Sequence, residues 1–138
     1  MIYVKRDITN DDLLQFIRGW IEVLAQKRYE DFFNALGYSM GGAAATADWI
    51  QSDLNRYRSD LYPGVTDFEV THWKTARGGN PNPLHEVVWY KPNDSRLVGA
   101  VTFQLPLNGM WSDSSADFVL LETDAPEGLL LKLEEIAV

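Results

Sequence analysis

Two histidines are the side chains best suited to acid–base chemistry in this chain of 138 residues. His72 and His85 fall in successive strand-like segments, with Glu69, Glu86 and Asp94 as the nearest carboxylates. A histidine facing a carboxylate can transfer a proton, and two histidines can ligate a metal, if several such groups converge on one point. The alternative is that each histidine is a surface or core-edge side chain satisfied by one hydrogen bond.

Tryptophan is abundant for this length, with five residues: Trp20, Trp49, Trp73, Trp89 and Trp111. Trp73 and Trp89 are placed to pair across a hairpin beside the two histidines. Together these four side chains would line an apolar pocket for a small molecule beneath covering helices. Aromatic side chains more often fill the core, and we expect this of Trp20 and Trp49.

A tight reversal and a polar cluster lie in the second half of the chain. Asn108-Gly109 is a strong hairpin signal, because both residues tolerate the positive φ angles of a type I′ turn. Trp111 and Asp113 follow this turn and are not explained by it. The oxygens of Ser112, Asp113, Ser114, Ser115 and Asp117 do not have the spacing of a calcium loop, and local capping of backbone amides is the alternative.

The composition argues against several classes of chemistry. The chain has no cysteine, no Gly-rich phosphate loop and no Gly-x-Ser-x-Gly nucleophile motif. We therefore predict no metal, no cofactor and no catalytic residue. No apolar run reaches the length of a membrane span and the first residues do not resemble a secretory signal, so we expect a cytoplasmic protein without a membrane partner.

The net charge of −8 is concentrated at one end of the chain. Residues 113–138 contain seven acidic residues and one basic residue, Lys132, and so supply −6 of it. Such a field repels nucleic acid and attracts a basic partner. We predict a binding surface with Trp111 as its anchor and Asp113, Asp117 and Glu122 as charged contacts. Solubility alone is the alternative explanation of the acidity.

The elements that position these residues follow from capping and periodicity. Thr9 begins a helix whose apolar side recurs at three- and four-residue intervals to Leu24, and a shorter helix follows over residues 28–36 with Gly37 as its C-cap. After the breaker at residues 39–42, a third helix is expected over residues 43–57. Strands are expected over residues 68–74, 84–91, 97–105, 116–122 and 129–136.

The order of these elements predicts the fold class. Short connections between the strands favour antiparallel neighbours. We predict a single α+β domain over residues 1–138, in which three N-terminal helices (residues 1–62) cover one face of a curved antiparallel sheet of about five strands (residues 63–138). The residues expected on the core faces are Leu97, Val101, Phe103 and Leu105 of one strand and Leu129, Leu131 and Leu133 of the last.

One segment carries a resemblance to a family. Residues 105–113 (LPLNGMWSD), followed by Ala116-Asp117-Phe118 and by the terminal pattern of Leu131, Leu133, Ile136 and Val138, resemble the C-terminal half of an uncharacterised family of small bacterial proteins. A Pro-Leu-Asn/Asp-Gly-Glu-Trp-Ser-Asp segment recurs in that family, and Met110 departs from its usual acid. The resemblance covers residues 84–138 and the helices only in outline, and the family implies no activity.

Two functions are expected from these patterns. The size, acidity and architecture resemble those of toxin-immunity proteins, which implies a non-catalytic inhibitor of a basic bacterial toxin. The element order also resembles the NTF2-like cone fold, although an early hairpin is missing. That resemblance implies a small-molecule-binding protein, or an enzyme with a histidine and carboxylate pocket, as the alternative. A monomer and a homodimer are both compatible with the sequence.

Overall fold

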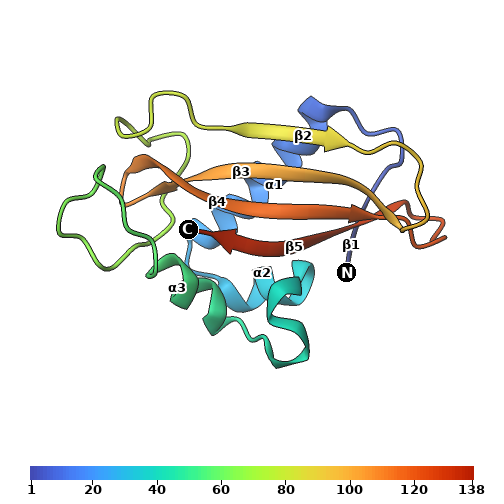
Figure 1. Cartoon of the computed structure of the whole chain (residues 1–138), viewed down its shortest axis with the longest axis horizontal. Coiled ribbons are helices and arrows are strands. Elements are labelled where there is room, and N and C mark those ends of the chain that lie inside the picture. The colour runs from blue at the N-terminus through green and yellow to red at the C-terminus, as the bar shows by residue number, and fades with distance from the viewer.

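The computed structural model describes all residues, 1–138, as an α+β domain with helices against one antiparallel sheet (Figure 1). The elements are β1 (Ile2–Val4), α1 (Asn10–Ala25), α2 (Tyr29–Leu36), the 3-10 helix η1 (Ser39–Ala44), α3 (Asp48–Leu54), β2 (His85–Trp89), β3 (Leu97–Leu107), β4 (Met110–Leu121) and β5 (Leu129–Ala137). The five strands are ordered β1-β5-β4-β3-β2 and the sheet is open. The predicted fold class is therefore confirmed.

The first two helices form where the sequence predicts them. The Thr9 hydroxyl accepts a hydrogen bond from the Asp12 N–H at 3.2 Å and caps α1. The buried side of α1 follows the predicted apolar stripe, with Leu13, Ile17, Ile21 and Leu24 fully covered. Gly37 ends α2 with a φ of 70°.

The third helix is shorter than expected. Residues 39–44 form a 3-10 helix that is broken at Gly42, where φ is 58°, and α3 spans only Asp48–Leu54. Ala45 is extended, with a ψ of 142°, so the helical hydrogen bonds do not continue from residues 39–44 into α3.

The sheet differs from the prediction at two strands. Residues 68–74 do not form a strand, and only Val70 makes a bridge, to Leu107. The fifth strand is β1, which pairs with β5 across most of the chain. This pairing is non-local. The periodicity of residues 68–74 therefore cannot show that β1, and not this segment, provides the fifth strand of the sheet.

The Asn108-Gly109 reversal is confirmed. Leu107 pairs with Met110, and the two turn residues have φ angles of 52° and 86°. The turn lets β4 start at Met110 instead of residue 116, so that β3 and β4 form one long hairpin.

The core lies between the helices and one face of the sheet. Val101, Phe103 and Leu105 point into it from β3, as predicted, and so do Leu129, Leu131 and Leu133 from β5. Leu97 is an exception to the predicted phase. A bulge between Leu97 and Gly99 places Leu97 opposite Leu121, on the other face of the sheet.

Candidate protein-binding face

One face of the sheet has no helix over it. In Figure 1, α1 runs behind the strands and α2 and α3 lie beside β5, so the nearer face is uncovered. The strand register aligns side chains on this face into rows across the sheet. We call it the uncovered face and define it by three rows: Tyr3, Leu130, Leu121 and Leu97; Lys132, Val119, Ala100 and Val88; and Glu135, Asp117, Thr102 and Glu86.

The first two rows of the uncovered face are predominantly apolar and lie outside the main cluster of buried side chains. None of these side chains is part of the cluster of 25 buried residues or packed against it. Val88 is 41% exposed, whereas Val119, in the middle of the sheet, is 9% exposed. A contiguous apolar patch left uncovered on a folded chain is typical of an interaction surface.

The third row is acidic. Asp117 lies opposite Glu135 on one side and Thr102 on the other, and the row ends at Glu86 on the sheet edge. Burial raises the pKa of Asp117, while a hydrogen bond donated by the Ser115 hydroxyl to Asp117 Oδ1 (2.7 Å) acts in the opposite direction. Lys132 is the single base of the uncovered face, so three carboxylates face solvent beside the apolar rows with one ammonium group among them.

Trp111 is held inside the chain. Its backbone N–H donates to Gly78 O and its carbonyl accepts from Asn80 N–H, and its ring lies 5.2 Å from that of His85. The side chain is partly buried against the core. Trp111 therefore has a structural role at the end of the β3–β4 hairpin.

Asp113 is exposed on the next part of β4. Its backbone N–H donates to the Tyr57 hydroxyl at 3.1 Å, and its carboxylate makes no ion pair. Asp113 is thus free to contact a partner.

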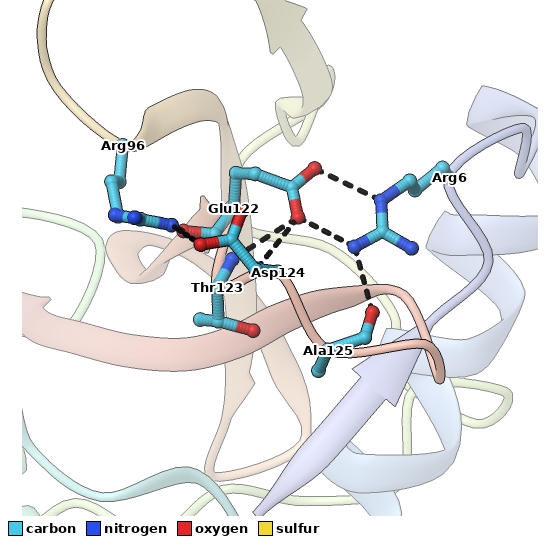
Figure 2. Close-up of polar contacts among 6 residues, drawn as sticks. All are labelled: Arg6, Arg96, Glu122, Thr123, Asp124 and Ala125. Atoms are coloured by element: carbon cyan, nitrogen blue, oxygen red, sulfur yellow. Dashed lines mark hydrogen bonds and ion pairs between the residues drawn. The ribbon is translucent and has the colours of Figure 1, made fainter.

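Glu122 is already paired (Figure 2). Arg6 donates to both carboxylate oxygens, at 2.9 and 2.5 Å, and also to the Ala125 carbonyl at 2.7 Å. The hydrogen bond from Arg6 lowers the pKa of Glu122 to about 2, with help from the backbone N–H groups of Asp124 and Thr123. Beside this pair, Arg96 contacts Asp124 at 2.9 Å. The contacts of Arg6 with Glu122 and Ala125 hold the β4–β5 connection against the segment before α1.

The four residues predicted to bind a partner do not converge on one spot. Trp111 and Glu122 lie near opposite ends of β4, roughly 35 Å apart at the rise of a strand. Of the four, only Asp117 belongs to the uncovered face.

The two histidines lie in different environments. His72 is exposed in a turn, where its Nε2 lies 3.3 Å from Glu22. His85 stacks on Phe103 with ring centroids 3.8 Å apart, and burial lowers the pKa of His85. Because residues 68–74 are not a strand, the two rings do not face each other across a hairpin.

Trp73 and Trp89, the other two side chains expected to line the small-molecule pocket, are separated as well. Trp73 lines a groove of about 400 Å³ on α1, together with Gln15, Arg18, Gly19, Glu22 and Lys74, and neither histidine lines it. The Trp89 indole donates to Asn10 at 2.7 Å, away from this groove. No group of three or more histidine and carboxylate side chains converges to hold a metal ion.

Of the uncovered face, sequence reasoning predicted only Asp117 as a contact and missed the apolar rows, which include Val88, Val119, Leu121 and Leu130. A signal was present: residues 118–121 and 129–131 are apolar in both strand phases. In an antiparallel sheet, such a run indicates that both faces are apolar.

Comparisons with protein-family models, curated proteins and solved structures return no match for this chain. The resemblance of residues 84–138 to a family of small bacterial proteins therefore stays a prediction. None of the helices has the length and apolar character required to cross a membrane.

Proposed function

We propose that this chain is a non-catalytic protein-binding protein, an immunity-type inhibitor that binds a basic bacterial toxin. The observation that carries the proposal is the uncovered face, where two apolar rows adjoin a row of three carboxylates. Apolar contacts supply the binding energy at such a surface, and the neighbouring acids attract a basic partner and orient it.

The environment of Asp117 also supports this proposal, because the charged carboxylate is partly buried. Burial raises its pKa, so the folded chain holds a carboxylate where a neutral side chain would be more stable. Carboxylates whose pKa is shifted by burial are common at functional sites.

The proposal uses only some of the predicted contact residues. Asp117 and Asp113 are available to a partner, whereas Glu122 is engaged by Arg6 and Trp111 by its own domain. Val88, Leu121 and Leu130 take the place of Trp111 as the apolar contacts.

The test uses purified basic proteins encoded by reading frames next to that of this chain. One of them is expected to bind in calorimetry, and its toxic activity is expected to be blocked at equimolar inhibitor. Asp117→Lys and Leu121→Lys should each weaken this binding at least tenfold, or by about 1.4 kcal/mol.

Thr66→Lys is the matched control, because Thr66 is exposed and the groove that it lines contains no residue of the uncovered face. It should bind like the unmodified chain. The proposal is wrong if none of these proteins binds, or if the two face variants bind as tightly as the control.

A further inference from the structure

The second strand leaves one edge of the sheet open. Tyr90 N–H donates to Val98 O, and Leu84 O accepts from Gln104 N–H, so even-numbered residues of this segment bond to β3. Hydrogen bonding alternates along a strand. The N–H and C=O groups of His85, Val87 and Trp89 therefore point away from β3, where no further strand is present.

This edge is also unusually apolar. The chain has nine exposed large hydrophobic side chains, and four of them lie on or beside β2. They are Leu84, Val88, Trp89 and Tyr90, each 40–45% exposed. An exposed apolar edge with free backbone groups is a template for pairing with another strand.

The opposite edge is blunted. β1 covers β5 only at residues 129–131. Further along β5, the Tyr38 hydroxyl accepts a hydrogen bond from Ile136 N–H at 3.0 Å. That N–H group is therefore not available to pair with another strand. Only the β2 edge is open along its length.

We propose that two copies of this chain pair through β2, antiparallel and centred on Val87, to form one ten-stranded sheet. This register places Trp89 opposite His85 of the second copy and Tyr90 opposite Leu84. Glu86 is the only charged residue within residues 84–90. It lies opposite Val88 of the second copy and not opposite Glu86 of that copy. Like charges therefore do not oppose each other within the new strand pair.

Charge complementarity between the α1 helices favours a second copy as the occupant. The start of α1 lies at Trp89, where Asn10 accepts from the indole N–H. Arg18 lies toward the His85 end, where its charge helps to lower the pKa of that histidine. Because Trp89 meets His85 across the two-fold axis, the Asp11 end of one α1 approaches Arg18 of the other copy.

Arg18 is available for this contact. It makes no ion pair within its own chain and lies 5.3 Å from the centroid of the Trp73 ring. Asp11 is exposed and likewise has no ion-pair partner. The pairing leaves the uncovered faces of both copies accessible, side by side in one sheet.

The test is the mass in solution, measured by size-exclusion chromatography with light scattering over a concentration series. The chain is expected to reach twice its mass of 15.7 kDa. Val88→Glu should raise the dimer dissociation constant at least tenfold, because it places a glutamate opposite Glu86 of the second copy. Val87→Pro should abolish the dimer, since it removes an N–H that β3 does not use.

A charge swap tests the register. Asp11→Arg and Arg18→Asp should each weaken the dimer about tenfold, and the double variant, which keeps the net charge of −8, should restore most of the affinity. Met40→Glu, which adds the same charge on η1, serves as the control and should dimerise normally.

The inference is overturned by a mass of 15.7 kDa at every concentration, or by a dimer that persists in Val88→Glu. If Val87→Pro unfolds, as judged by circular dichroism, Val88→Glu decides alone. A dimer that dissociates in Asp117→Lys but not in Val88→Glu would place the interface on the uncovered face and would equally reject pairing through β2.

Discussion

At the scale of single residues, burial and pairing divide the acidic side chains into two kinds. Arg6 neutralises Glu122 and holds its pKa at about 2, so that carboxylate stabilises the fold. Asp117 makes no ion pair, and burial raises its pKa. Two acids five residues apart in one acidic segment therefore have opposite effects on folding.

Asp117→Asn is expected to stabilise the chain at neutral pH by less than about 1 kcal/mol, because the variant removes a half-buried charge and keeps the Ser115 contact. A raised folded pKa means that the cost is present at high pH and disappears as pH falls through that pKa toward the unfolded value of 3.8. Chemical denaturation at several pH values measures the difference.

Asp113→Asn is the matched control, since Asp113 is exposed and has no ion pair. Its unfolding free energy should stay within about 0.5 kcal/mol of the parent protein. A loss of stability in Asp117→Asn at neutral pH would show that the carboxylate stabilises the fold.

At the scale of elements, the turn between β3 and β4 organises more than its own hairpin. The Asn108 side chain accepts from Glu69 N–H at 2.9 Å and donates to Asp67 O at 3.0 Å. The turn thereby fixes residues 67–69, which have no strand partners of their own in the sheet. One residue sets both the reversal and the path of the preceding loop.

Asn108→Ala is expected to cost about 2 kcal/mol, because it loses both side-chain hydrogen bonds and places alanine at a positive φ. Asn108→Gly keeps the backbone angle accessible and should cost less. Thermal and chemical unfolding measure both variants against Asn34→Ala, an exposed helical control. Equal losses in the alanine and glycine variants would show that the φ angle contributes nothing.

At the scale of the whole molecule, helices and sheet share one core. The cluster of 25 buried residues includes Leu13 and Phe32 from the helices and Phe103 and Leu131 from the sheet. Neither the helical part nor the sheet part can bury its apolar side alone. Such an arrangement favours cooperative unfolding.

Unfolding is therefore expected to occur in one transition. Helix loss by circular dichroism at 222 nm and tryptophan fluorescence should give the same midpoint in guanidinium, because the tryptophans are distributed over residues 20–111. Two separate midpoints would show that residues 1–62 and 63–138 fold as independent units.

The sequence alone determined the local elements of this protein. Capping by Thr9, the apolar stripe of α1 and the Asn108-Gly109 turn depend on neighbours within a few residues, and each prediction is confirmed. The α+β class follows from the order of such elements. By contrast, the periodicity of residues 68–74 predicts a strand that does not form, because strand pairing depends on distant partners.

Only the tertiary structure decided which surfaces are free. β1 pairs with a strand more than a hundred residues away, Arg6 engages Glu122, and His85 stacks on Phe103. The helices bury their apolar sides against the other face of the sheet and beside β5, which leaves no helix over the rows around Asp117 and Val119. These outcomes come from long-range contacts, whereas composition and spacing determine only the local elements that make them.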